Sequence, residues 1–423
     1  MSDYQLFRCE IIAVGSELLT PYFQDTNSLF VTEKLNNLGI DVAFKTVVGD
    51  HSGDLAQCFR TAFSRTRLVV VIGGLGPTKD DLTRETLAES LHKKLIFQQG
   101  ILTAMEKRFK RRGLAMSAVN KKQAYIPEGA EILDNPNGTA PGLFLEEKNR
   151  IIVLLPGPPK EFHPMFMDKV IPRLEKFRQG YSFRTVLKTT GLAESELETK
   201  ILDLYPADPE INLTILAAPG QIDIHILAHS RKSTESAREK IHGVSQNIQR
   251  RLGDPIFSSD GRSLEEVIGD LLRKNHKTAA VAESCTGGLI GHRITNVPGS
   301  SNYFLQGVQA YSNRAKTKRL GVPAGLIKHN GAVSSIVAGK MAAGIRRTAG
   351  ADFGLAVTGI AGPGGGIPEK PAGLVYTALS WDNGVHVEKN IFNGDRETVK
   401  FRSSQKSLDM LRIHLMHGAG EGG

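Results

Sequence analysis

The chain has 423 residues, too many for one ordinary hydrophobic core, so two or three domains are expected. Its 40% hydrophobic and 23% charged residues are typical of a soluble globular protein, and the net charge of +9 favours anionic small molecules or weak nucleic-acid contact without proving either. The three cysteines, Cys9, Cys58 and Cys285, are far apart in sequence and form no C-x-x-C motif, so no disulfide framework or zinc site is implied. No apolar run approaches 18 residues and no signal peptide is evident, so a cytoplasmic protein is expected.

Residues 1–172 are expected to form the first domain, because strand and helix patterns alternate along them. The expected strands are 9–15, 41–49 and 67–74, and the expected helices are 25–39 and 52–65. Apolar runs bounded by Gly suit a parallel sheet covered on both faces. Residues 150–162 then read as strand, tight turn and helix. The pattern predicts a doubly wound α/β domain.

Two further segments and a short tail follow. Residues 173–255 read as a small α+β linking module with strand, helix, two strands and helix, and 221–230 alternate as a half-exposed antiparallel strand does. Residues 256–417 again read as α/β, with more hairpin character. Ser263 and Glu266 form a capping box at the start of its first helix. Residues 418–423 are expected to be a disordered tail.

The run GGLGPTKDDLTRETLAESL, residues 73–91, lies between the strand VVVI and an expected helix. Glycines let a backbone turn approach a pyrophosphate, and the next helix offers N–H groups to an anion. Asp80 and Asp81 in that turn suit a divalent cation such as Mg²⁺. The alternative is a β–α turn in which Thr78, Asp80 and Asp81 only cap the helix.

Other stretches are expected to meet this turn, because ligands of open α/β sheets bind at the carboxyl ends of strands. They are GSELLTPYFQDTNS (15–28), with Glu17, Asp25 and Asn27, and LPGPPKE (155–161), which follow strands, and NPNGTAPG (135–142), which precedes one. Together these motifs resemble the molybdopterin-binding (MogA/MoaB-like) domain at the front of CinA proteins. One departure is Thr20-Pro21, where many relatives carry a Gly after the ELL element.

That resemblance implies metal-dependent ADP-ribose pyrophosphatase activity in the first domain. It implies that Gly73, Gly74 and Gly76 lie near the pyrophosphate and that Asp80 and Asp81 lie near a divalent metal ion of unknown identity. Asn27 is taken as a further substrate-binding candidate.

TAAVAESCTGGLIGHRI, residues 278–294, places three candidate nucleophiles side by side at a strand-to-helix turn. The turn position favours Ser284, which needs a base because its free pKa is far too high. No His lies in a motif here, and a Lys serves as a base if burial lowers its pKa. AYSNRAK (310–316) supplies Tyr311 and Lys316 at another strand-to-helix turn, although packing of Tyr311 and solvation of Lys316 is the alternative. Cys285 is expected to pack, and Thr286 to start the helix.

A third piece is AVTGIAGPGGGIPEKPAG, 356–373, whose Gly and Pro residues indicate a fixed loop of close approach. Thr358 and the N–H groups from Gly359 to Gly362 are candidates to hold a phosphate or an amide oxygen, and a flexible hairpin loop is the alternative. Arg396 and Arg402, near the last helix, either neutralise a phosphate or are surface charges.

AESCTGG, PGSSNYF, AYSNRAK, HNGAVS, AVTGIAGPGGG, KPAGLVY and GDRETV resemble the CinA C-terminal domain in order, over about 160 residues. That family contains nicotinamide-nucleotide amidases. The resemblance implies nicotinamide mononucleotide (NMN) as substrate, no cofactor for this domain, Ser284 as nucleophile, and Lys316 and Tyr311 as its activating partners. Gly287, Gly288, Thr358, Gly359, Gly362 and Arg396 are the expected substrate-binding residues. Ser335 departs from the acidic residue that relatives often have after AVS.

The combined expectation is a bifunctional pyridine-nucleotide enzyme, a homo-oligomer whose partners are NMN and ADP-ribose rather than membrane or nucleic acid. A regulatory protein linked to competence or DNA damage, with a pterin-binding first domain that does not hydrolyse, is the alternative. The basic run Lys107–Arg112 is read as a solvated helix face or as a phosphate-contacting patch.

Overall fold

The computed structural model describes residues 7–417, so the expected tail at 418–423 lies outside the described residues. The chain divides into two compact units, one of residues 1–183 with 229–238 and one of residues 184–228 with 239–423. Among the described residues, none of the helices is both long and apolar enough to span a membrane.

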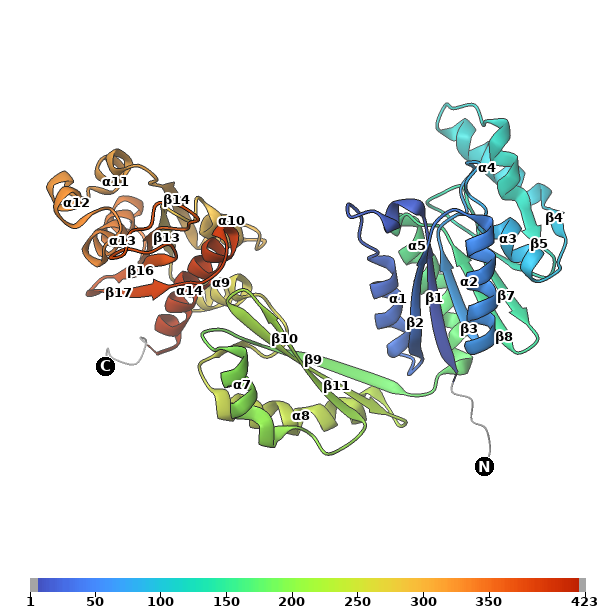
Figure 1. The fold of residues 1–423 in the computed structure, drawn as a ribbon, viewed down its shortest axis with the longest axis horizontal. Helices are drawn as coiled ribbons and strands as arrows, with labels where there is room; N and C mark the ends of the chain where they lie inside the picture. The colour runs from blue at the N-terminus through green and yellow to red at the C-terminus, as the bar shows by residue number, and fades with distance from the viewer. Residues whose placement is uncertain (1–6, 418–423) are drawn as a thin grey trace. The chain divides into compact units, whose positions relative to one another are not determined.

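The first domain is built on a sheet with the strand order β2-β1-β3-β8-β7-β6 (Figure 1). Its strands are β1 (Arg8–Val14), β2 (Asp41–Val48), β3 (Leu68–Ile72), β6 (Glu131–Leu133), β7 (Gly142–Glu147) and β8 (Arg150–Leu155). β1, β2, β3 and β8 run parallel, whereas β7 and β6 add an antiparallel edge. The carboxyl ends of the parallel strands therefore share one edge of the sheet.

Helices cover both faces of this sheet, as the doubly wound prediction required. The helices of this domain are α1 (Asn27–Asn36), α2 (Ser52–Arg65), α3 (Thr83–Ser90), α4 (Gln99–Arg111), α5 (Pro159–Met165) and α6 (Ile171–Leu174). Ile11 of β1 packs in one core with α1 and α5, and its neighbour Ile12 packs in another with α2 and α3. Successive strand residues point to opposite faces, so the uninterrupted apolar runs fill both cores.

The helix α4 follows the short strand β4 (Leu95–Phe97), which pairs antiparallel with β5 (Tyr125–Pro127). Most of the basic run lies at the end of α4, where Lys107, Lys110 and Arg111 are exposed and Arg108 is half-buried. The solvated-face interpretation thus holds for most of the run but not for Arg108.

The middle module forms a second sheet in the order β10-β11-β9-β12. Its elements are β9 (Tyr181–Thr189), α7 (Glu194–Ile201), β10 (Ile211–Ala218), β11 (Gln221–Ser230), α8 (Thr234–Leu252) and β12 (Ile256–Ser258). Side chains of β11 alternate between buried and half-buried, as the sequence predicted. Ile256–Ser258, placed by sequence in the third segment, pairs with β9 and so belongs to this sheet.

The C-terminal domain has a third sheet in the order β14-β13-β15-β16-β17. Its strands are β13 (Ala279–Glu283), β14 (Phe304–Gln309), β15 (Phe353–Gly359), β16 (Leu374–Trp381) and β17 (Gly384–Ile391). β13 runs parallel to β14 and β15, whereas β16 and β17 continue antiparallel, which is the hairpin character expected.

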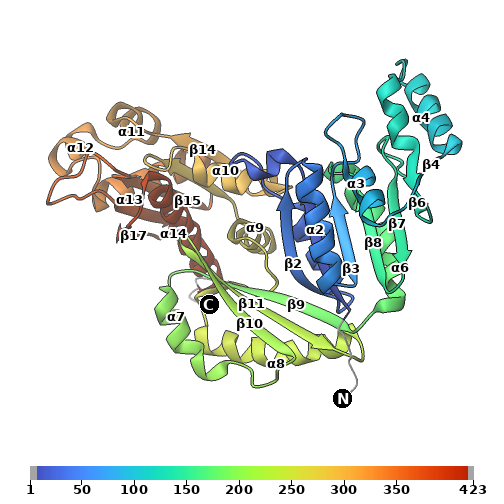
Figure 2. The ribbon, with the colours of Figure 1, turned by 45° about the vertical axis from the view of Figure 1, so that its right-hand side comes forward.

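Two layers of helices enclose this sheet (Figure 2). The helices are α9 (Leu264–Lys274), α10 (Leu289–Thr295), α11 (Asn313–Leu320), α12 (Ala324–Asn330), α13 (Ser335–Ala349) and α14 (Arg396–His417). Residues of α9, α10 and α14 share one apolar core, and those of α11, α12 and α13 share the other. The predicted capping box is present: the Ser263 N–H donates to Glu266 Oε2 at 2.7 Å, and the Ser263 hydroxyl accepts from the Glu266 N–H at 3.4 Å.

Candidate active sites

Ser284 stands directly after β13, where the chain turns toward α10. Its backbone N–H donates to the carbonyl of Val357 in the adjacent strand β15 at 3.0 Å, which fixes the residue against the sheet. Gly287 and Gly288 both have positive φ, a conformation that glycine adopts without steric cost. The sequence of the turn therefore allows the chain to reverse sharply after Ser284, whose exposed fraction is 8%.

Glu283 holds this turn from inside. Its carboxylate is 2% exposed and accepts hydrogen bonds from the N–H groups of Gly288 (3.0 Å), Ile290 (3.1 Å) and Gly291 (2.9 Å). A buried carboxylate at the start of a helix satisfies donors that have no partner within the helix. The N–H of Gly288, an expected substrate-binding residue, is thus already engaged, and that of Gly287 donates to the Ser284 carbonyl.

Lys316 reaches Ser284 from the start of α11. Its Nζ lies 3.0 Å from Ser284 Oγ, 2.9 Å from the Ala310 carbonyl and 3.3 Å from the Tyr311 carbonyl. The side chain is 2% exposed, and burial lowers its pKa from the ordinary lysine value. Desolvation penalises the charged ammonium and favours the neutral amine, which is the form that accepts a proton. The structure thus brings together the serine and the lysine that the two motifs singled out.

Tyr311 takes a different position from the one expected of an activating side chain. Its phenol oxygen accepts from Arg396 Nη2 at 3.2 Å, and its side chain is 64% exposed. Only its backbone carbonyl contacts Lys316. Arg396 Nη1 also donates to the Gly362 carbonyl at 2.9 Å, so this guanidinium joins Tyr311 to the Gly/Pro loop.

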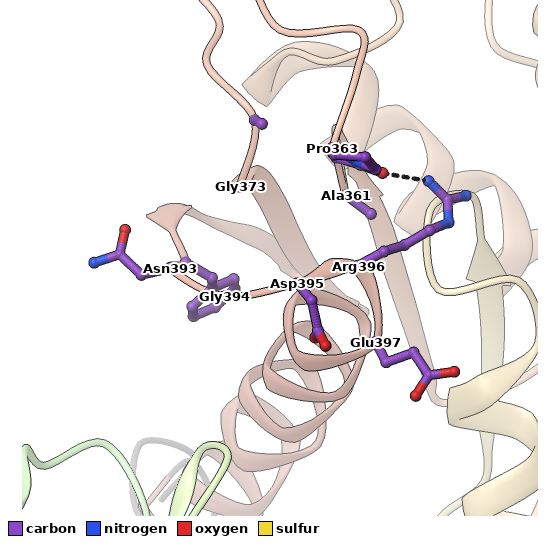
Figure 3. A pocket seen from close by; sticks show the side chains of 11 residues that line it. Ala361, Pro363, Gly373, Asn393, Gly394, Asp395, Arg396 and Glu397 are labelled. Carbon is purple, nitrogen blue, oxygen red and sulfur yellow. Dashed lines mark hydrogen bonds between the residues drawn. The ribbon is translucent and has the colours of Figure 1, made fainter.

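A cavity of about 440 Å³ lies beside Arg396 (Figure 3). It is lined by Ala361, Gly362, Pro363, Ala372, Gly373, Phe392, Asn393, Gly394, Asp395, Arg396 and Glu397. Thr358 and Gly359 are not among these residues: the Thr358 hydroxyl is buried and donates to the Ala332 carbonyl at 2.9 Å. Arg402 donates to the Asn393 carbonyl at 3.0 Å and so supports the cavity wall.

The neighbours of Ser284 have other roles in the turn. Cys285 packs in the apolar core, and burial raises the pKa of its thiol to about 12, which disfavours the nucleophilic thiolate. The Thr286 hydroxyl is buried and has no hydrogen-bond partner within residues 7–417. In the same range, the N–H groups of Cys285 and Thr286 donate to no oxygen, and both lie close enough to the Cys285 sulfur to act on the pKa of its thiol. An oxygen bound beside Ser284 would compete with this weak acceptor for the two N–H groups.

A second candidate site lies at the strand edge of the first domain, in a cavity of about 400 Å³. Four loop segments predicted from sequence to meet do line it. They contribute Gly15 and Glu17; Gly73 to Thr78 with Asp80 and Asp81; Thr139 and Ala140; and Pro156, Gly157, Pro158 and Glu161. Asp50 after β2 and Gln123 also line it, and sequence reasoning missed both; Asp50 follows a parallel strand, which was the available signal.

The glycines of this turn are required by packing. Gly73 and Gly74 have positive φ, and a Cβ would collide with the Val14 carbonyl at Gly73 and with the Thr83 side chain at Gly74. A Cβ at Gly76 would collide with the Asp81 carboxylate. All three glycines also line the cavity, to which they present backbone atoms only.

The two aspartates of the turn differ. Asp81 accepts from the Thr78 N–H at 2.8 Å and from its hydroxyl, so it shapes the turn. Asp80 is exposed, and the nearby Thr78 side chain lowers the pKa of its carboxyl. Within residues 7–417, no three His, Cys, Asp or Glu side chains are grouped to hold a metal ion. Mg²⁺ is commonly held by one or two carboxylates with substrate phosphates and water, and these two carboxylates fit that donor set.

Asn27 lies behind this cavity rather than in its lining. Its Nδ2 donates to the Gly157 carbonyl at 2.7 Å, and its Oδ1 is buried without a partner among the described residues. Gly157 does line the cavity, so Asn27 supports the wall.

Comparison with known proteins covers nearly the whole chain. Family models match residues 10–176 (probable molybdopterin binding domain), 184–258 (damage-inducible protein CinA KH domain) and 261–415 (CinA C-terminal domain). A CinA-like protein of Dictyoglomus thermophilum is 44% identical over 410 residues, which cover 97% of this chain and 100% of the relative. A CinA-like protein of Koribacter versatilis is 43% identical over 413 residues, 96% and 99% of the two chains.

Solved structures are similar to part of the chain. The protein CinA of Thermoplasma acidophilum, described as of unknown function, is 34% identical and covers 39% of this chain and 98% of its own, with a TM-score of 0.37. A competence/damage-inducible protein of Agrobacterium tumefaciens is 36% identical over 38% of this chain and 100% of its own, with a TM-score of 0.35. By its match to full-length relatives, the chain belongs to the CinA family.

Proposed function

We propose that the C-terminal domain hydrolyses the carboxamide of NMN to nicotinate mononucleotide and ammonia. The observation that carries this proposal is the 3.0 Å contact between Ser284 Oγ and the buried Lys316 Nζ. Neutral Lys316 takes the hydroxyl proton while Oγ attacks the amide carbon. The proton then passes to the departing nitrogen, and ammonia leaves an acyl-serine ester. Water, deprotonated by the same amine, cleaves that ester and restores Ser284.

Backbone donors near the serine support an acyl-transfer reaction. The negative charge on the amide oxygen in the transition state requires N–H groups that have no other partner. The N–H groups of Cys285 and Thr286 have no oxygen acceptor and only the weakly accepting Cys285 sulfur nearby, whereas those of Gly287, Gly288 and Ile360 donate to protein oxygens. The N–H of the residue that follows the nucleophile is used in this way at other strand-to-helix nucleophile turns.

The first experiment measures ammonia release from NMN by the purified chain in the presence of a chelator. We expect turnover by the native chain and by Cys285→Ala, and loss with Ser284→Ala. Equal rates for Ser284→Ala and the native chain would refute the assignment. If ammonia release depended on Cys285 instead, Cys285 would be the nucleophile.

For the first domain we propose metal-dependent cleavage of the pyrophosphate bond of ADP-ribose. The glycine turn, which lines the cavity with backbone atoms beside two carboxylates, supports this function. A divalent ion held by Asp80 and Asp81 would neutralise the phosphates and polarise the bond to be cleaved. The glycine turn places backbone against the phosphates, and Lys122 secures the turn by donating to the carbonyls of Thr78 (2.6 Å) and Asp81 (2.7 Å).

The test of this second activity is phosphate-bond cleavage of ADP-ribose with and without added Mg²⁺ or Mn²⁺. AMP and ribose 5-phosphate should appear only with metal. A chain that is stabilised against heat by a pterin, but neither binds nor cleaves ADP-ribose, would instead be a pterin-binding protein.

One sequence observation bears on the nucleic-acid alternative. KH domains clamp the backbone of nucleic acids with a G-x-x-G loop, and residues 184–258 contain no G-x-x-G. We therefore favour the two nucleotide-hydrolysing activities. Tight DNA or RNA binding with a steep salt dependence and without turnover would reverse this choice.

A further inference from the structure

Another cavity lies near the glycine turn. It is a groove of about 590 Å³ between α4 and residues 132–141. Figure 2 shows α4 and β6 at the same end of this domain. The residues that line the groove are Gln98, Gly100, Ile101, Ala104, Met105, Arg108, Arg111, Ile132, Asp134, Asn135, Pro136, Gly138, Thr139 and Pro141.

One stripe of α4 forms a wall of the groove. Ile101, Met105 and Arg108 are spaced by four and three residues, and Ala104 and Arg111 lie three residues from Ile101 and Arg108, so the five share a helix face. The stripe is apolar at its start and cationic at its end. Two arginines of the basic run thus face a groove, while their neighbour in the run, Lys107, does not line it.

The opposite wall is held rigidly. Asn135 is buried, donates to the Ala140 carbonyl (2.8 Å) and to Glu161 Oε2 (2.7 Å), and accepts from the Gly138 N–H (2.8 Å). A Cβ at Gly138 would collide with Glu161, so this loop has little room to move. Arg108 donates to the carbonyls of Asn135 (3.1 Å) and Pro136, which ties the loop to α4.

This loop contributes to the walls of both cavities. Thr139 lines the groove and also lines the cavity of the glycine turn. A ligand whose pyrophosphate lies at the glycines can therefore extend past Thr139 into the groove. We propose that the groove binds the adenosine end of ADP-ribose, an inference that rests on the proposed pyrophosphatase function.

The side chains suit a nucleoside. The exposed Ile132 and the half-buried Ile101 provide apolar surface for the flat face of adenine, and the buried Met105 packs behind them. Arg111 is exposed and makes no ion pair or hydrogen bond within residues 7–417, so its guanidinium is free to stack on the ring. The exposed carboxylate of Asp134 is an acceptor for ribose hydroxyls or the adenine amino group. Arg108, by contrast, is committed to the loop.

The experiment compares ligands with and without the base. Calorimetry measures binding of AMP and of ribose 5-phosphate with Mg²⁺, and steady-state kinetics measures KM for ADP-ribose. Ala104→Trp fills the groove from an exposed helix position, and Arg111→Ala removes the stacking cation. Lys107→Ala removes the same charge from the same helix outside the groove and is the matched control.

We expect Ala104→Trp and Arg111→Ala to weaken AMP binding and raise KM for ADP-ribose about tenfold, as loss of a stacked cation or of the binding surface would. Ribose 5-phosphate binding, kcat and the Lys107→Ala control should change less than twofold. The two variants act independently, so misfolding of one, seen by circular dichroism, leaves the other as the test.

Two outcomes overturn the inference in distinguishable ways. ADP-ribose cleavage with an unchanged KM in both groove variants would show that the base binds elsewhere, while the pyrophosphatase function stands. Absence of binding of ADP-ribose and AMP to the native chain would remove the groove assignment together with that function.

Discussion

The two candidate sites differ in how complete they are within the protein itself. Around Ser284, hydrogen bonds already join the base to the serine and Glu283 to the turn, and Lys316 and Glu283 are both buried. At the glycine turn, the backbone is shaped by packing, but the Asp80 carboxylate is exposed and no three metal-binding side chains are grouped in the described residues. Amide hydrolysis needs only groups that a folded chain supplies. Cleavage of a pyrophosphate requires that the phosphate charge be neutralised. A metal ion bound by this turn and by the substrate's own oxygens would do so.

Replacement of the base should have the largest effect. Lys316→Met removes the proton acceptor and should lower kcat/KM for NMN by about 10³-fold, within the usual range for a general base. Tyr311→Phe leaves the backbone carbonyl that contacts Lys316 and should cost less than tenfold. Initial rates of ammonia release check both variants. A larger loss in Tyr311→Phe than in Lys316→Met would give the phenol the activating role instead.

Metal removal should affect only the first domain. A chelator, or Asp80→Asn, should lower ADP-ribose cleavage about 10²-fold because the phosphate charge is no longer neutralised. Ammonia release from NMN should stay within twofold. Asp168→Asn, an exposed aspartate outside the cavity, is the control. If chelation lowered both activities equally, the Ser284 site would also depend on a metal ion, and the two sites would not differ in this respect.

The support beneath Ser284 can be tested with Glu283→Gln. Three N–H groups lose a charged acceptor, which should lower the free energy of unfolding by about 2 kcal/mol. Urea unfolding of the purified variant measures this loss. Glu397→Gln, a change at an exposed residue, is the control. A change below about 0.5 kcal/mol, the size typical of surface substitutions, would mean that the turn does not depend on the charge.

The pH profile of the amidase should follow Lys316. Burial lowers the pKa of this amine below the ordinary value of 10.5, and only its neutral form accepts a proton. Below that lowered pKa, kcat/KM should rise about tenfold per pH unit and then level off before pH 10.5. The rise of kcat/KM with pH should be missing from the residual activity of Lys316→Met. A flat profile in the native chain would exclude a titrating lysine base.

Cys285→Ala should have the smallest effect. The thiol is buried with a raised pKa, so its removal should change kcat/KM by less than threefold. The lost packing should lower the free energy of unfolding by about 1 kcal/mol. Thermal melting and NMN turnover measured on one preparation separate these effects. A loss of turnover without loss of stability would show that the thiol takes part in the reaction.

The sequence by itself predicted the doubly wound first domain, because uninterrupted apolar strands bounded by glycine have few other solutions. It also placed Ser284 at a strand end and Lys316 at the next such turn, since local patterns report where a strand stops. The capping box at Ser263 is likewise a purely local signal. These features depend on residues within a few positions of one another.

The tertiary structure decided what depends on contacts distant in sequence. Pairing of β12 with β9 drew 256–258 into the middle sheet, and no local pattern reports a strand partner. The Tyr311 phenol lies on Arg396, 85 residues away, whereas Lys316 reaches Ser284 because β13 and β14 are adjacent and parallel. Packing also decides which N–H groups beside Ser284 lack an oxygen acceptor. It likewise turns Arg108 and Arg111 toward a groove. Burial and hydrogen-bond partners are properties of the assembled sheets and helices, and the order of residues encodes them only through the fold.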